Sequence, residues 1–148
     1  MLNPFELRTI LLAKHAQHVV LIHFPIALFI MGVLFDLLSR GKQGSQLAAA
    51  AYLNLSVAAV AVLPTYATGV LAWRFALAGA TLKGVVFLHF VAASCTVLLV
   101  LVSWWIHWRA RKFEPLRLPR YRVPIELLGV AVIAITAHLG GFLSGVNS

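Results

Sequence analysis

Charged residues are scarce in this sequence, and carboxylates are the scarcest of them. Only 11% of the 148 residues are charged, and just 4 are Asp or Glu. Because a soluble domain has about 25% charged residues, the composition excludes an ordinary soluble fold. The shortage of carboxylates also argues against a carboxylate-rich metal centre and against an acid/base hydrolase.

Cysteine and methionine are equally rare. The single cysteine, Cys95, excludes an internal disulfide, a CxxC redox pair and a CxxCH haem attachment site. Only 2 methionines are present, whereas copper sites in membrane proteins typically use methionine ligands. Histidine is therefore the residue type from which a metal site in this chain would be built.

Apolar residues, in contrast, make up 61% of the chain and gather in long runs. A transmembrane helix needs about 20 consecutive, mostly apolar residues. Four segments meet this requirement: residues 18–38, 47–73, 84–108 and 124–142. The short connections between them leave no room for a soluble domain and make successive helices antiparallel neighbours. We therefore expect residues 1–148 to form a single all-α membrane domain, an up-down-up-down bundle of four transmembrane helices.

The N-terminal segment differs from these four runs. Residues 1–17 carry apolar side chains at mixed helical spacing together with Arg8 and Lys14. This pattern predicts a short interfacial helix that lies on the membrane surface.

The basic residues orient the bundle. The formal net charge is +8, and the bases stand at the ends of apolar runs, so lipid headgroups rather than nucleic acid are the expected anionic partner. Eight of them follow the first or third span: Arg40, Lys42, Arg109, Arg111, Lys112, Arg117, Arg120 and Arg122. The opposite side has four: Arg8, Lys14, Arg74 and Lys83. The positive-inside rule then predicts that the side with eight bases faces the cytoplasm and that both termini lie on the other side, which is the periplasm if the membrane is a bacterial inner membrane.

Several polar residues lie near the cytoplasmic ends of these spans. His107 stands among three tryptophans, a pattern typical of an aromatic belt, and is expected to be an interfacial side chain. Asp36 and Glu126 lie near Arg40 and Arg122 and are expected to form exposed ion pairs that contribute little to stability.

Four other histidines lie inside or at the edge of the apolar spans: His18, His23, His89 and His138. Ionisable side chains at membrane depth are costly and normally mark a functional site. A rise of about 1.5 Å per residue puts His23 and His89 roughly 8–9 Å inside the same membrane edge. His138 returns to that side at a similar depth, so four imidazoles converge on the periplasmic half of the bundle. Taken singly, each could instead bond to a backbone carbonyl of a neighbouring helix.

Imidazoles without carboxylates or thiols favour bis-histidine ligation of a b-type haem. Zinc sites usually include a carboxylate or a cysteine, whereas a haem iron needs only two neutral imidazoles on opposite sides. Because spans one and three are diagonal in an up-down bundle, His23 and His89 are the expected axial pair. His18 and His138 would form a second pair that holds a second haem or contacts a quinone or a propionate. Pairing of His23 with His138 remains an alternative, and the chain is expected to bind one or two haems b.

The surroundings of these histidines are consistent with a large planar ligand. Gly140 and Gly141 beside His138 would let the backbone approach a ring edge. Pro25 should loosen or kink the first span near His23. Arg74 and Lys83 lie within reach of haem propionates, although both would also suit lipid-facing side chains that extend to the interface.

Motifs along the chain resemble a bacterial membrane family catalogued as domain of unknown function 2231. The resemblance rests on HAQHVVLIHFPIALFIMGVLFDLL at residues 15–38, on Thr68 and Gly69 followed by Trp73, on His89, and on Leu-Gly-Gly at 139–141. Where many members have Trp, this chain has His138, as do members fused to cytochrome c-like domains. The resemblance implies a four-helix membrane module in which haem binding is expected, without a defined activity.

Three functions are compatible with these features. The leading hypothesis is a b-type cytochrome subunit of a larger respiratory or photosynthetic redox complex, with other redox subunits, a periplasmic cytochrome c or a quinol as partners. Six-coordinate iron leaves no position for a substrate, so catalysis by this chain alone is not expected. The alternative is a structural or assembly subunit without haem, in which the histidines bridge helices. A transporter with a histidine-lined path is the third, although the chain is short for one.

Overall fold

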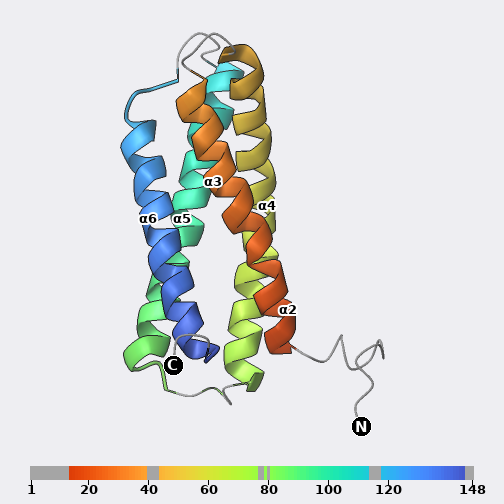
Figure 1. Ribbon diagram of the computed structural model, residues 1–148, viewed down its shortest axis with the longest axis vertical. Coiled ribbons are helices and arrows are strands. Elements are labelled where there is room, and N and C mark those ends of the chain that lie inside the picture. The colour runs from red at the N-terminus through yellow and green to blue at the C-terminus, as the bar shows by residue number, and fades with distance from the viewer. Residues whose placement is uncertain (1–13, 40–43, 77–78, 80, 114–117, 146–148) are drawn as a thin grey trace, which may run out of the picture.

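A computed structural model describes residues 14–39, 44–76, 79, 81–113 and 118–145. Within these ranges all regular structure is helical. The helices are α2 (Lys14–Leu21), α3 (His23–Leu38), α4 (Gly44–Ala76), α5 (Gly84–Phe113) and α6 (Arg122–Leu143). Figure 1 shows that they run side by side as one elongated bundle. The predicted all-α fold is therefore confirmed.

Four stretches are long and apolar enough to cross a membrane: Gln17–Leu38, Gly44–Phe75, Gly84–Phe113 and Arg122–Leu143. They agree with the four predicted spans but extend beyond them at several ends. The largest extension adds Arg109–Phe113 to α5, because Arg, Lys and Ala favour a helix and continue it past the apolar run. Residues 1–13 of the predicted interfacial helix lie outside the described residues. Its remaining residues, 14–17, begin α2, whose later residues form the start of the first span.

Neighbouring helices are antiparallel. α3 packs on α4, α4 on α5, α5 on α6, and α3 makes a smaller contact with α6 that closes the bundle. α3 and α5 are therefore diagonal, as predicted. We call the end with α2, the start of α5 and the end of α6 the histidine end, and the opposite end the basic end (Figure 1).

A small apolar core fills the middle of the bundle. Phe29 is fully buried and packs so closely on α6 that a Cβ at Gly129 would lie 2.8 Å from its ring. A Cβ at Gly32 would similarly lie 2.9 Å from Leu55. Small residues thus bring the helices close together, as is common between membrane helices. Many large apolar side chains lie exposed on the outer faces, for example Val60, which is the arrangement that a lipid environment favours.

The first span is interrupted at Ile22, between α2 and α3. Pro25 lacks the N–H group that would bond to the Leu21 carbonyl four residues earlier. The Thr65 hydroxyl of α4 shares its single proton between that carbonyl oxygen, at 3.4 Å, and the Ala61 carbonyl oxygen, at 2.8 Å. Hydroxyl side chains of neighbouring helices commonly satisfy such backbone groups in membranes. The predicted effect of Pro25 is therefore present, and it sets α2 apart as a separate segment that packs on α4.

Candidate functional site

His18, His23, His89 and His138 all belong to the histidine end of the bundle. Their surroundings nevertheless fall into two kinds. His18 and His89 are half-buried, whereas His23 and His138 are exposed. Each half-buried imidazole forms a hydrogen bond to a neighbouring helix and packs against a glycine of that helix.

His18 on α2 is held by the last third of α4. Its Nδ1 lies 3.1 Å from the Thr65 carbonyl oxygen and 3.2 Å from the Thr68 hydroxyl. A carbonyl oxygen can only accept, so Nδ1 carries the proton and Nε2 has the lone pair of the neutral ring. A Cβ at Gly69 would lie only 2.9 Å from His18 Cε1. This position therefore requires glycine if the imidazole is to lie flush against α4.

His89 on α5 is held by α6 in the same way. Its Nδ1 donates to the Thr136 carbonyl oxygen at 3.1 Å. A Cβ at Gly140 would lie 3.3 Å from His89 Cε1. Gly140, which was expected to let the backbone approach a cofactor ring, thus lies against an imidazole of the protein itself.

These two sets of contacts are an internal repeat of the chain. In each set, 47 positions separate the histidine from its threonine. The offset between the sets is 71 in all three pairs, the difference between residues 89 and 18, 136 and 65, and 140 and 69. The threonine hydroxyls repeat as well, since each donates to the carbonyl four residues earlier at 2.8 Å. One helical hairpin consists of α2, α3 and α4, and the other consists of α5 and α6. These two hairpins therefore present equivalent imidazoles from diagonal positions in the bundle.

This geometry suits imidazoles that ligate a metal. Histidine ligands commonly donate their second ring N–H to a backbone carbonyl, which fixes the tautomer and directs the other nitrogen at the metal. His18 and His89 both have such a bond, and each has a glycine that leaves room for the ring. The donor set, two neutral imidazoles without a carboxylate, fits a bis-histidine haem iron.

The remaining predicted residues at this end lie differently. His23 is the first residue of α3, and the ring of His138 packs edge-on against Phe142 with centroids 5.0 Å apart. Arg74 and Lys83 are both exposed near the connection of α4 to α5, and Gly141 is partly buried. The structure thus groups His18 with His89 by their contacts and leaves His23 and His138 on the outside.

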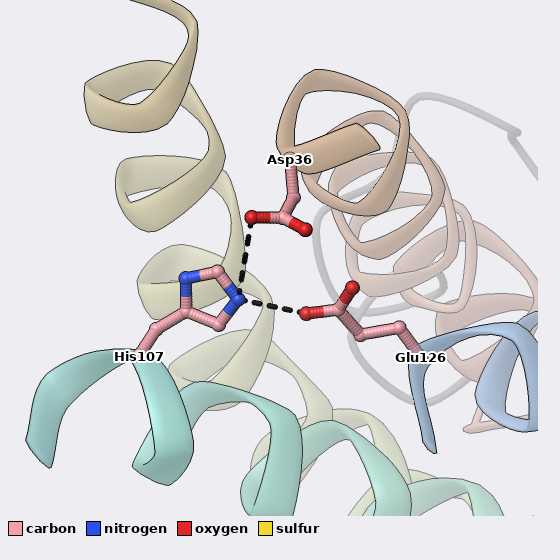
Figure 2. A group of neighbouring side chains, drawn as sticks. All are labelled: Asp36, His107 and Glu126. Carbon is pink, nitrogen blue, oxygen red and sulfur yellow. Dashed lines mark hydrogen bonds and ion pairs between the residues drawn. The ribbon is translucent and has the colours of Figure 1, made fainter. Parts of the chain in front are cut away.

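A second polar cluster, which we call the buried quartet, lies at the basic end and consists of Asp36, His107, Arg122 and Glu126. His107 Nε2 lies 2.7 Å from Glu126 Oε1 and 3.9 Å from Asp36 Oδ1 (Figure 2). Arg122 Nε donates to Asp36 Oδ2 at 3.0 Å. Asp36 and Glu126 have no exposed side-chain surface, and His107 has 2%.

The expectations for these residues were wrong about burial. His107 is not an interfacial side chain, and Asp36 and Glu126 do not form exposed ion pairs. Arg122 was expected near an acidic partner and has one in Asp36, whereas Arg40 lies outside the described residues. The physical reason is that these side chains point between the helices, where a partner of opposite charge compensates for lost hydration.

Helical spacing from core residues could have revealed the buried quartet. Asp36 follows Phe29 by two turns, and His107 follows Val100 by the same interval. Residues seven apart share a helix face, so both polar side chains continue the faces that form the core. Their position beside basic residues and tryptophans indicated a membrane interface instead.

Comparisons with known proteins give a family and nothing closer. No curated protein and no solved structure matches this chain. The sequence profile of domain of unknown function 2231, described as a predicted membrane protein, matches residues 14–146, and the chain therefore belongs to this family.

Proposed function

We propose that the chain is a membrane-embedded b-type cytochrome subunit that carries electrons within a larger redox complex. The observation that carries the proposal is the repeated setting of His18 and His89. Two imidazoles with the same tautomer, each anchored through Nδ1 and each backed by a glycine, stand at one end of the bundle. Two neutral imidazoles presented from diagonal helices are the kind of donors that a bis-histidine haem iron uses.

In this proposal the partner of His89 is His18 and not His23, which the sequence had favoured. His23 lies exposed at the start of α3, whereas His18 shares its contacts with His89. In this proposal His18 and His89 would hold a single haem, and the second pair expected from His18 and His138 is not needed. A haem held by these residues would supply one-electron transfer.

The residues of this chain bind and orient the cofactor. The Thr65 and Thr136 carbonyls hold the two rings in orientation. Arg74 and Lys83 belong to the same end, and their positive charges would neutralise the propionates.

The proposal also includes an orientation and partners. With the basic end in the cytoplasm of a bacterium, the histidine end faces the periplasm. An electron carrier such as a cytochrome c would then approach from that side, and a quinol would reach the bundle through the bilayer. Other redox subunits of a respiratory or photosynthetic complex would pack against the apolar outer faces of the helices.

An absorption spectrum of the purified chain tests the proposal. We expect a Soret band, a sharp α band after reduction, and a pyridine haemochrome of b type. His18→Ala and His89→Ala should each reduce the haem per chain to less than about a tenth, because loss of one axial ligand removes half of the iron's protein contacts. His23→Ala and His138→Ala are the matched controls and should retain the cofactor. A chain that stays colourless when produced with ample haem would contradict the proposal.

The second candidate is a structural or assembly subunit without haem. The hydrogen bonds from His18 to α4 and from His89 to α6 support it, because they bridge helices without any ligand. In that case His18→Gln and His89→Gln variants should assemble normally with their membrane partners. The spectrum therefore separates the two candidates.

A further inference from the structure

The buried quartet at the basic end has no role in the proposed haem site. His107 and His89 both lie on α5, but a rise of about 1.5 Å per residue separates them by about 27 Å. Any ligand at the basic end is therefore independent of the histidine end.

Three donors in the quartet converge from three different helices. Asp36 belongs to α3, His107 to α5 and Glu126 to α6, and one donor atom of each lies within 4.8 Å of the others. Figure 2 shows His107 Nε2 directed between the two carboxylates. A nitrogen and two carboxylate oxygens form a donor set that suits a divalent transition-metal ion.

Part of the hydrogen-bonding capacity of these residues is unused. Asp36 Oδ1, Glu126 Oε2 and the hydroxyl of Ser103 are buried and have no hydrogen-bond partner in the described structure. Ser103 precedes His107 by one turn on the buried face of α5. Unsatisfied polar atoms cost about 1–3 kcal/mol each, and more when charged. Two of the three atoms belong to the carboxylates that face His107, so they are available to a cation.

Arg122 holds the Asp36 carboxylate in position and is not itself one of the three donors. Its Nε bonds to Asp36 Oδ2 and leaves Oδ1 on the side of His107. Carboxylates that ligate metals are commonly held by such an outer bond. Two carboxylates against one guanidinium leave one negative charge when His107 is neutral, and this charge favours a cation at the three donors.

We propose that Asp36, His107 and Glu126 bind one divalent transition-metal ion, with Zn²⁺ as the reference cation. Zinc-to-ligand distances of about 2.0–2.2 Å imply donor separations of about 3.3 Å. The observed 2.7 Å and 3.9 Å separations from His107 Nε2 bracket this value, and the two carboxylate oxygens lie within 4.8 Å of one another, so ligation requires the three side chains to adjust around the ion. Binding displaces the proton shared by His107 and Glu126, and about one proton is released per ion.

Metal analysis of the chain, purified without a polyhistidine tag, tests the site. We expect about one zinc per chain by elemental analysis, and visible d–d bands when Co²⁺ replaces it. After chelation, a Zn²⁺ titration in weak buffer should release about one proton per ion. Glu126→Gln and His107→Gln should weaken Zn²⁺ binding at least about 100-fold, whereas His138→Gln at the other end should not change it.

The failure of this proposal differs from the failure of the haem proposal. Glu126→Gln should leave the haem spectrum unchanged, and His89→Ala should leave zinc binding unchanged. If a Glu126 variant does not fold, the native chain decides the question: a chelator should lower its melting temperature, and Zn²⁺ but not Mg²⁺ should restore it. A native chain that neither binds zinc nor responds to it would overturn the proposal and leave the quartet as a proton-holding ion-pair network.

Discussion

Gly69 and Gly140 determine how closely each imidazole approaches the neighbouring helix. The hypothetical Cβ contact is tighter at Gly69, 2.9 Å, than at Gly140, 3.3 Å. Contacts shorter than about 3 Å cannot be kept, so the ring must move, whereas the longer contact needs only a small adjustment.

We therefore predict graded effects of alanine at these two positions. Gly69→Ala should displace His18, reduce haem binding severely and cost about 1–3 kcal/mol through overpacking. Gly140→Ala should be milder, because the gain in helix propensity of about 1 kcal/mol offsets part of the crowding. Haem per chain and thermal unfolding measure both effects.

Gly32→Ala is the matched control for this series. It creates an equally tight 2.9 Å contact, but with Leu55 in the core rather than with a histidine. This variant should lose stability and keep its haem spectrum when folded. Equal haem loss in all three variants would show that general destabilisation, and not the position of the imidazole, causes the effect.

The residues of the histidine end were found from the sequence because histidine stands out in an apolar span. The choice between His18 and His23 could not be made there. It depends on which imidazole reaches a backbone carbonyl of α4, and that is determined by how the first span is rotated against α4 in the folded bundle. The buried quartet was overlooked because an acid near a base at a span end has the same pattern whether it is exposed or buried.

At the scale of the element, the separation of α2 from α3 positions His18. Pro25 leaves the Leu21 carbonyl without its helical donor, and the Thr65 hydroxyl supplies a long, shared bond to it beside its shorter bond to Ala61. The adjacent Thr65 carbonyl accepts the bond from His18. One turn of α4 thus stabilises both the break and the imidazole.

Pro25→Ala should separate stability from cofactor binding. An alanine N–H can bond to the Leu21 carbonyl, which restores one backbone hydrogen bond with a net contribution of about 1 kcal/mol. We expect a continuous first span, unchanged or higher thermal stability, and reduced haem per chain because His18 turns away from α4. Circular dichroism and the Soret absorbance measure the two quantities.

Pro64→Ala is the control for this variant, since Pro64 is an exposed proline inside α4. It should affect stability without affecting haem. Full haem occupancy in Pro25→Ala would show that the break is not needed to place His18.

The elements themselves were predicted with little error. Runs of apolar residues fix the number and type of the helices, because a bilayer accepts no other arrangement of a chain with so few polar residues. The ends of α4 and α5 were less accessible to prediction, since a helix can continue into the headgroup region when its residues favour it.

For the whole molecule, the internal repeat means that each hairpin contributes one imidazole. The connection between α4 and α5 contains Gly79 and Gly84, both with positive φ, and it lies at the surface end of the bundle. Among its described residues, Gly79 and 81–83, none supplies the carbonyl that anchors His18 or His89 through Nδ1, since these carbonyls belong to Thr65 in α4 and Thr136 in α6.

A chain divided in this connection should therefore assemble from two parts. Segments 1–80 and 81–148, produced together, are expected to copurify and to show the haem spectrum of the intact chain. Either segment alone has one of the two ligands and should bind haem at least about tenfold more weakly. Coexpressed halves that copurify without haem, while the intact chain holds it, would contradict this division of the ligands.

The offset of 71 residues also relates positions at the basic end, but there the related residues differ in kind. Asp36 corresponds to His107, and Leu55 and Ala51 correspond to Glu126 and Arg122, all of them buried. Two identical hairpins could supply matching imidazoles, but they could not supply an acid from one side and a base, a second acid and a guanidinium from the other. Joining the hairpins in one polypeptide lets one end remain symmetric while the other end becomes asymmetric.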